Sequence, residues 1–287
     1  MERIVGIIVH PTRSEATAFA TEVIAWLGKR GIGVRLDSDT AFRLNQPPLE
    51  YSPEAWGAVE FILTLGGDGT ILTAARLASP AGTPILGVHM GRFGFIAETH
   101  PNTLFRHLER VLNGQMRIEE RMMVRGEVWR KGERLMERIG LNDALVKNRH
   151  AQMLQLKTSL GGAPFATYPA DGVIVATPTG STAYSLSAGG PLVAPTVRAM
   201  IVTPICPHTL SARPMVVPDD EIIEIEVEAE GEDAIFEVDG ADAFPLRSGD
   251  RVVIRRADYM TRLIVLDHAT FYRKVRDRYL YGERLNE

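Results

Sequence analysis

Along the first third of the chain, short apolar runs alternate with longer stretches whose apolar residues recur at helical spacing. Ile4–Val9 (IVGIIV) is almost continuously apolar, and Glu15–Arg30 follows it with the pattern of an amphipathic helix. Further strands are predicted at 33–36, 61–65 and 85–89, and a helix at 72–78. Nearly continuous apolar strands separated by helices are typical of a parallel sheet covered on both faces. The pattern predicts an α/β domain.

The rhythm changes at about residue 117, beyond which few long helical segments occur. Glu221–Glu228 (EIIEIEVE) alternates with nearly period two, which predicts a strand with one face in water. Lys131-Gly132 and Asp239-Gly240 are dipeptides typical of tight hairpin turns. The strands predicted here are 122–130, 135–139, 152–158, 173–176, 201–203, 222–227, 234–238, 252–255 and 263–266. We therefore expect an α/β domain over 1–115 and a largely β domain over 116–267. The basic tail 272–285 is predicted to be an exposed helix with an apolar stripe of Val275, Tyr279 and Leu280.

Composition narrows the class of protein. The chain has 287 residues, of which 45% are hydrophobic and 24% charged, the balance of a soluble globular protein. Its net charge of -4 argues against a nucleic-acid binder. No apolar run is long enough to span a membrane, and no cleavage site follows the opening MERIVGIIVHP. The single cysteine, Cys206, cannot form an intramolecular disulfide, which favours a cytoplasmic setting.

The most informative segment is Gly66–Thr70 (GGDGT), which lies between a predicted strand and a helix. Glycines allow positive φ and a close approach of the backbone to a ligand, so that successive N–H groups point at a phosphate. A following helix adds its positive N-terminal end. Gly66, Gly67 and Thr70 are therefore candidate phosphate-binding residues. The same letters also occur in ordinary tight turns.

Asp68 distinguishes this segment from other phosphate loops. Neither the GxGxxG fingerprint nor a P-loop lysine is present. A carboxylate among phosphate-facing N–H groups repels the phosphate unless it has another task. Two tasks fit, which are accepting a proton from an attacking hydroxyl and holding magnesium.

A second cluster covers Asp171–Pro191, where an apolar strand runs into a stretch dense in hydroxyls and glycine. Ser181 or Thr182 is expected to cap a short helix, which Gly189-Gly190-Pro191 then ends. Such a stretch suits a ribose or an amide, although most Ser/Thr/Gly-rich stretches are only loops. The expected contacts are Thr182, Tyr184 and Ser187, with Asp171 on a ribose diol. Asn142-Asp143 offers an amide beside a carboxylate for a sugar or an adenine edge, and is equally a common turn pair. His208 has no partner spacing that indicates zinc, and we expect no protein metal site.

Taken in order, five segments resemble the ATP-dependent NAD kinase family, with matching spacing over about two-thirds of the chain. They are Gly66–Thr70 (GGDGT), Gly91–Phe95 (GRFGF), Asn142-Asp143, Asp171–Pro191 and Pro207–Pro214 (PHTLSARP). GGDGT alone is shared with diacylglycerol, sphingosine and phosphofructokinase-type enzymes. The long segment TPTGSTAYSLSAGGP is far more specific to NAD kinases.

The resemblance implies an enzyme that transfers the γ-phosphate of ATP to the 2′-hydroxyl of the adenosine ribose of NAD, with a divalent metal, expected to be magnesium. It implies a cleft between the two domains, a last segment of about 268–287 that returns to the first domain, and a homodimer or homotetramer. No nucleic-acid or membrane partner is expected.

The resemblance also assigns roles to individual residues. Asp68 is the implied proton acceptor, with Gly69 beside the substrate and Phe95 near the adenine. Asn142 and Asp143 meet the adenosine half, and Asp171 the nicotinamide half, in part from a neighbouring subunit. The same pocket is lined by Thr182, Ala183, Tyr184, Ser185, Leu186 and Ser187.

Two positions depart from the family pattern. Position 143 is Asp where many relatives carry Glu, so its carboxylate stops one methylene short. Position 169 is Pro where many relatives carry a basic residue two places before the Asp, so any cationic contact there must come from elsewhere, with Arg149 and Lys147 as candidates. Two other functions stay open. One is a lipid kinase of the diacylglycerol or sphingosine type, and the other is a dinucleotide sensor without catalysis.

Overall fold

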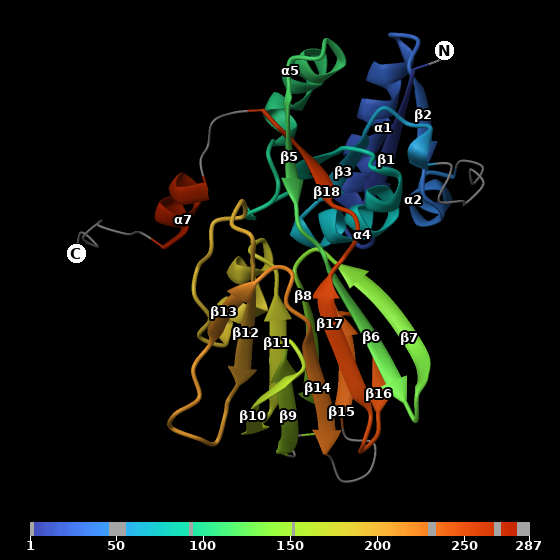
Figure 1. Cartoon of the computed structure of the whole chain (residues 1–287). Coiled ribbons are helices and arrows are strands. Elements are labelled where there is room, and N and C mark those ends of the chain that lie inside the picture. The colour runs from blue at the N-terminus through green and yellow to red at the C-terminus, as the bar shows by residue number, and fades with distance from the viewer. Residues whose placement is uncertain are drawn as a thin grey trace. The chain divides into compact units, whose positions relative to one another are not determined.

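The computed structural model describes residues 3–45, 56–91, 94–150, 153–228, 234–266 and 271–279. The chain forms two compact units (Figure 1). The first unit comprises Met1–Glu120 and Met260–Glu287, and the second comprises Arg121–Tyr259.

The first unit is built on a six-stranded sheet of order β2-β1-β3-β4-β18-β5. Its strands are β1 (Ile4–Val9), β2 (Gly33–Leu36), β3 (Ile62–Gly66), β4 (Ile85–His89), β5 (Arg117–Arg121) and β18 (Thr261–Val265). The pairs β1/β2, β1/β3 and β3/β4 are parallel, as the apolar pattern predicts. Because β2 and β3 flank β1 on opposite sides, the strand order reverses at β1. The carboxyl edge beside that reversal is where open α/β sheets bind ligands.

Helices cover both faces of this sheet. The helical segments of this unit are α1 (Ser14–Gly28), α2 (Ser38–Arg43), α4 (Asp68–Ala78), the 3-10 turn η1 (Ser79–Ala81), α5 (Pro101–Leu112) and α7 (Phe271–Tyr279). On one face, buried side chains of α1 and α5 such as Leu27 and Leu104 form a single core with Ile7 and Leu63. On the other face, α4 contacts β3 and β4. The helix of α5 is not among the elements expected from the sequence.

The second unit contains two six-stranded sheets, of order β10-β9-β14-β17-β6-β7 and β13-β12-β11-β8-β15-β16. Its strands are β6 (Val124–Arg130), β7 (Glu133–Gly140), β8 (Asp143–Asn148), β9 (Leu154–Leu160), β10 (Ala163–Ala170), β11 (Gly172–Ala176), β12 (Ala199–Ile205), β13 (Met215–Pro218), β14 (Ile223–Glu228), β15 (Ala234–Val238), β16 (Ala241–Leu246) and β17 (Arg251–Arg256). A short 3-10 turn η2 (Gly180–Thr182) and the helix α6 (Tyr184–Ser187) follow β11. The two predicted hairpin turns are confirmed, since β6/β7 and β15/β16 pair in antiparallel fashion. Both of their turn dipeptides have positive φ at each residue.

The last strand belongs to a different sheet from the one the sequence indicates. We expected 263–266 in the β domain, but β18 lies beside β4 with Leu263 opposite Ile85. Its apolar run carries no information on which sheet it joins. Packing decides this, because Ile264 and Leu266 complete the core beneath α1 and α5. The units accordingly meet at 120/121 and 259/260 rather than at 115/116 and 267/268.

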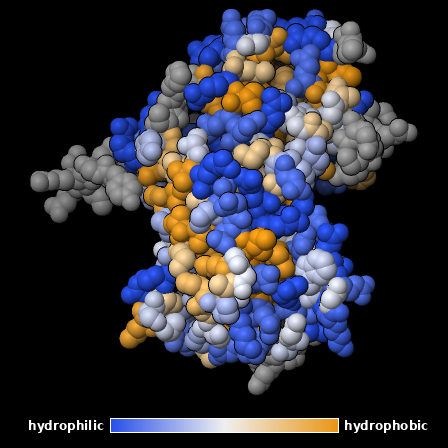
Figure 2. All heavy atoms as spheres, viewed as in Figure 1, coloured by the Kyte–Doolittle hydropathy of each residue, from blue (hydrophilic) through white to orange (hydrophobic). Residues whose placement is uncertain are grey.

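The C-terminal helix is shorter in the described part of the chain than the predicted 272–285. It covers Phe271–Tyr279, with Val275 buried and Tyr279 40% exposed. Residues 280–285 of the prediction, including Leu280, lie outside the described residues. None of the described helices is long and apolar enough to cross a membrane. The visible surface is mostly hydrophilic, with hydrophobic patches among the polar side chains (Figure 2).

Candidate functional site

The GGDGT segment lies at the carboxyl edge of the first sheet, between β3 and α4. Gly66 ends β3, and Gly67 is the only residue between the strand and the helix, which begins at Asp68. The sequence predicts the helix from residue 72, because two glycines and an aspartate lower helix propensity. The expected left-handed backbone is also wrong, since Gly66, Gly67 and Gly69 are not among the glycines with positive φ.

Close packing and open space explain these glycines better than backbone freedom does. A Cβ at Gly66 would overlap the Thr70 hydroxyl, whereas no described atom lies within 4 Å of a Cβ built at Gly67 or Gly69. Thr70 is only 4% exposed, so its side chain faces the interior rather than a ligand. The first N–H groups of a helix have no intrahelical acceptor. The amides at the start of α4 are therefore the anion-binding feature of this segment.

The carboxylate of Asp68 accepts three consecutive backbone N–H groups. The Phe95 amide donates to Oδ2 at 2.8 Å, and the Ile96 and Ala97 amides both donate to Oδ1 at 3.3 Å. We call residues 95–97 the clamp segment. Gly94 directly precedes it, and a Cβ there would overlap the Asp68 carboxylate. Glycine at this position therefore lets the clamp segment close on the aspartate.

The clamp segment fixes the orientation of Asp68 but leaves its carboxylate able to accept a further hydrogen bond. An ionised carboxylate has about four acceptor sites, and the clamp segment uses three. The first-turn position on α4 adds the favourable field of the helix N-terminus. Asp68 is thus a fixed anion with about one acceptor site left for a ligand proton or cation.

Two arginines and a histidine that the sequence reasoning missed lie near the same sheet edge. His10 directly follows β1, and its side chain is close to a Cβ built at Gly66. Arg13 donates to the carbonyl of Met90, and Arg43 donates to the carbonyl of His10 at 3.1 Å. Burial, and then Arg13 and Arg43, lower the pKa of His10. The position of these residues directly after the first apolar strand is the signal that could have identified them.

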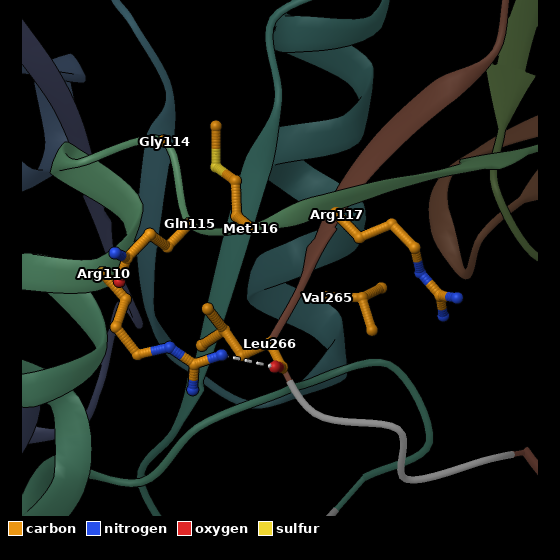
Figure 3. Close-up of a pocket in the computed structure, with 7 residues that line it drawn as sticks. All are labelled: Arg110, Gly114, Gln115, Met116, Arg117, Val265 and Leu266. Carbon is orange, nitrogen blue, oxygen red and sulfur yellow. Dashed lines mark hydrogen bonds between the residues drawn. The ribbon is translucent and has the colours of Figure 1, made fainter.

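Two hollows of the first unit are described, of which one borders the clamp segment and the other lies at the opposite edge of the sheet, where Arg3, just before β1, donates to the carbonyl of Leu112. One, of about 610 Å³, is lined by the clamp segment and by residues of α5 and α7. The other, of about 370 Å³, lies where α5 ends and β5 and β18 meet (Figure 3). In the second hollow Arg110 donates to the carbonyl of Leu266 at 3.0 Å. Its lining includes no acid, histidine or hydroxyl, so it offers no group for general acid–base chemistry. Arg92 and Phe93 of the GRFGF segment lie outside the described residues.

In the second unit, Asn142 and Asp143 are held by another aspartate. The carboxylate of Asp239, in the β15/β16 turn, accepts the amides of Leu141, Asn142 and Asp143 at 2.8, 2.8 and 3.2 Å. The carbonyl of Asn142 accepts the Thr177 amide at 2.8 Å. A Cβ at Gly180 would overlap the backbone of Asn142. The structure thus brings the Asn142-Asp143 pair against the start of the hydroxyl-rich stretch.

Asp143 is a buried acid whose pKa is raised. It is 4% exposed, and burial together with Asp239 and Glu237 raises its pKa to about 7. The shorter side chain of Asp at this position lies within the fold, at the first residue of β8. Near neutral pH its carboxyl group is therefore present in both protonation states.

The hydroxyl-rich stretch separates into accessible and buried positions. Tyr184 is 41% exposed, Ser187 is exposed, and Thr182 is half-buried, as are Ala183 and Leu186. Ser185 is fully buried, and its hydroxyl lies 2.9 Å from that of Thr203. The side chain of Ser185 therefore serves the fold, and only its backbone is a candidate contact.

The capping of this stretch differs from the expectation. Neither Ser181 nor Thr182 caps a helix, and the Gly180 amide instead donates to the Thr177 hydroxyl at 3.1 Å. The hydroxyl of Ser181 donates to the carbonyls of Pro178 and Val193. Neither η2 nor α6 has a side-chain cap, and Thr177, which directly follows β11, holds only the first amide of η2. The predicted stop is confirmed, since Gly189 has φ +89 directly after α6 and its C-cap.

Asp171 lies at the opposite end of the sheet from Asp143. Strand β11 pairs with β8 so that Ala176 faces Asp143 and Gly172 faces Lys147. At about 3.4 Å per residue, Asp171 is about 17 Å along the strand from that end. Its carboxylate accepts the Asn148 side-chain amide at 3.1 Å. Within one chain, Asp171 and Asp143 do not meet the same part of a ligand.

Near Asp171 lie His208 and the two candidate cations, Lys147 and Arg149. The carbonyl of Pro169 accepts the His208 amide at 2.7 Å, which places His208 at this end of the sheet. Lys147 forms an ion pair with Glu237 at 2.8 Å, whereas Arg149 is exposed. Of the two suggested cations, Arg149 is the one without an ion pair described for it. Among the described residues, no three His, Cys, Asp or Glu side chains gather where they could hold a metal ion.

Comparisons with known proteins match both units. The chain matches the ATP-NAD kinase N-terminal domain over residues 5–116 and the ATP-NAD kinase C-terminal domain over residues 141–266. It is 45% identical over 283 residues to the NAD kinase of Moorella thermoacetica, covering 98% of this chain and 90% of that protein. It is 43% identical over 276 residues to the NAD kinase of Symbiobacterium thermophilum, covering 95% and 97%.

Two solved structures share the fold. Yeast NADH kinase complexed with NADH superposes with a TM-score of 0.89 at 24% identity, covering 100% of this chain and 90% of that one. An NAD kinase from Archaeoglobus fulgidus in complex with ATP superposes with a TM-score of 0.74 at 23% identity, covering 98% and 100%.

The close fit of Gly94 predicts a destabilising substitution. Gly94→Ala forces a methyl group against the Asp68 carboxylate and is expected to lower the free energy of unfolding by about 1–3 kcal/mol. Gly69→Ala is the control, because a Cβ there meets no described atom within 4 Å and alanine favours the helix. Chemical denaturation measures both. Equal stability of the two variants would contradict the described fit.

The burial of Asp143 predicts a pH-dependent stability. Its folded pKa of about 7 exceeds the ordinary 3.8, so its protonated form favours folding. This contribution is fully present below pH about 4 and is lost as the pH rises towards about 7, by at most about 4 kcal/mol. Asp143→Asn should raise the melting temperature at pH 8 without nucleotide and flatten its decline from pH 5 to 8. Asp220→Asn, at an exposed position, should change neither. A wild-type decline that persists in Asp143→Asn would show that another group titrates.

Proposed function

The chain belongs to the ATP-NAD kinase family, and we propose that Asp68 accepts the proton of the attacking hydroxyl in its reaction. The enzyme phosphorylates NAD to NADP with ATP as co-substrate. The lipid-kinase alternative is thereby excluded, because both units match domains of NAD kinases.

The chemistry assigns one task to each participant. The 2′-oxygen of the adenosine ribose attacks the γ-phosphorus, and the bond from that phosphorus to the β–γ bridging oxygen breaks, which releases ADP. The hydroxyl proton passes to the Asp68 carboxylate and from there to solvent. Because phosphoryl transfer passes through a loose transition state, orientation of the hydroxyl and stabilisation of phosphate charge supply most of the catalysis.

The clamp segment is the observation that carries this proposal. The sequence left two tasks open for Asp68, proton acceptor and magnesium ligand. Three backbone N–H groups occupy three of the about four acceptor sites of the carboxylate and hold it in one orientation, so about one acceptor site is left for a ligand. One remaining acceptor site is enough for a single hydrogen bond from the attacking hydroxyl, which is the task that we assign to Asp68. The open backbone at Gly67 and Gly69 and the helix start of α4 support phosphate binding beside it.

We further propose that the second unit binds the dinucleotide. The accessible groups of Thr182, Tyr184 and Ser187 and the fixed pair Asn142-Asp143 support this role. Phe95 and Gly69 are the corresponding candidates in the first unit. Ala183, Ser185 and Leu186 are expected to contribute backbone or apolar contacts only.

The position of Asp171 supports an oligomeric enzyme. Because Asp171 lies at the far end of β11 from Asp143, we propose that it acts on the nicotinamide half of a substrate held by a second copy of the chain. A homodimer or homotetramer satisfies this geometry. A cytoplasmic location stays a proposal that rests on the single cysteine.

Replacement of the carboxylate tests the proposed base. Asp68→Asn is expected to lower kcat by roughly 10²–10⁴-fold, because the amide accepts no proton at neutral pH. NAD binding, measured by calorimetry, should stay within severalfold of wild type. Asp39→Asn removes an exposed carboxylate of the same unit and should leave kcat unchanged. Asp68→Asn activity within severalfold of wild type would refute the assignment.

A chelator tests the proposed metal requirement. The triphosphate carries clustered negative charge that a divalent cation, expected to be magnesium, must neutralise for transfer to proceed. Excess EDTA should stop NADP formation from NAD and ATP, and added magnesium should restore it. NADP formation that continues in EDTA would contradict a role for metal.

A further inference from the structure

The ammonium group of Lys274, on α7, is bound to the far side of the clamp segment. It donates to the carbonyl of Phe95 at 3.1 Å and to that of Ala97 at 3.3 Å. It also forms an ion pair with Glu98 at 2.8 Å. These three acceptors match the three donors of an ammonium group. The side chains of Lys274 and Glu98 are 18% and 9% exposed, so the pair is largely withdrawn from water.

The clamp segment therefore lies between two opposite charges. Its N–H groups point at the Asp68 carboxylate, and two of its carbonyls point at the Lys274 ammonium. The peptide group between Phe95 and Ile96 is held from both sides, because its carbonyl accepts from Lys274 and its N–H donates to Asp68. Each charge therefore stabilises the orientation of this peptide dipole that the other one needs. Two side chains of the same helix also contact the Phe95 ring, with the Arg278 guanidinium 5.0 Å from its centre and the Tyr279 ring stacked at 6.1 Å.

We propose that Lys274 is a positioning residue for phosphoryl transfer, acting through the clamp segment on Asp68. This inference rests on the proposed role of Asp68. Lys274 holds residues 95–97 where their N–H groups fix the carboxylate, and without it the clamp segment relaxes and Asp68 loses its orientation. A misplacement of about 1 Å at a reacting group can cost roughly a hundredfold in rate. The C-terminal helix thus belongs to the catalytic apparatus although it contributes no reacting atom.

The test compares substitutions on one helix. Lys274→Met keeps the aliphatic stem and removes the charge, and is expected to lower kcat roughly ten- to a hundredfold. Lys274→Arg retains the donors and should recover most of the activity. Arg276→Met is the matched control, since the contacts described for Arg276 are those to its neighbour Asp277, and it should leave kcat unchanged.

A second variant separates positioning from folding. Lys274→Met leaves Glu98 buried without its cation, which can lower stability by itself. Lys274→Met combined with Glu98→Gln removes both charges, so the protein should fold while kcat stays low. Amide hydrogen exchange should report faster exchange at residues 95–97 in this double variant than in wild type. A folded double variant with wild-type kcat, or with unchanged exchange at residues 95–97, would overturn the inference.

A double-mutant cycle identifies Asp68 as the group through which Lys274 acts. In the Asp68→Asn background, Lys274→Met should lower the residual kcat by less than twofold, because the oriented carboxylate is already absent. A full ten- to hundredfold loss in that background would mean that Lys274 acts elsewhere, and would refute the inference. An active Asp68→Asn enzyme would instead refute the proposed base, so the two failures are distinguishable.

Discussion

The carboxylate of Asp68, bound by three consecutive backbone amides, is the interaction on which the proposed catalytic site depends. It requires the one-residue link between β3 and α4, which places Asp68 in the first turn of a helix at the sheet edge. It also requires glycine at position 94, where a Cβ would collide with the carboxylate. On the opposite side of the clamp segment, Lys274 donates to the carbonyls of Phe95 and Ala97, the first and last residues of the segment that holds the acid. A single peptide segment thus joins the proposed proton acceptor to the C-terminal helix.

The second unit uses the same arrangement for a different purpose. Asp239 also accepts three consecutive amides, and these belong to the residues that lead into β8. Here the candidate ligand contacts are Asn142 and Asp143, whose amides are bound, and Asp239 holds them in place. The cost of this arrangement falls on Asp143, which is buried beside two other acids and has a raised pKa. Such a buried, partly protonated acid is typical of a binding site rather than of a structural core.

The sequence predicted what depends on local pattern, and missed what depends on packing between distant segments. The parallel strands of the first unit, the hairpin turns at Lys131-Gly132 and Asp239-Gly240, and the fold class follow from periodicity and turn chemistry. Asp68 could be identified from the sequence because a carboxylate in a phosphate-binding loop repels the phosphate unless it has another task. The groups that bind Asp68 could not be identified in this way, because no spacing rule connects residue 68 to residues 95–97 or 274. Likewise, nothing in their letters distinguishes Ser185, buried against Thr203, from the accessible Ser187.

The most direct test of this account is the single-turnover rate of NADP formation by Asp68→Glu. Glutamate keeps the charge but carries the carboxylate one methylene further from the backbone of α4, so that it no longer fits the amides of residues 95–97 and the closely placed Gly94. If a fixed orientation is what makes Asp68 effective, the rate should fall roughly a hundredfold or more although a carboxylate is present. A rate close to that of wild type would show that any nearby carboxylate suffices, and would contradict the central role given to the clamp segment.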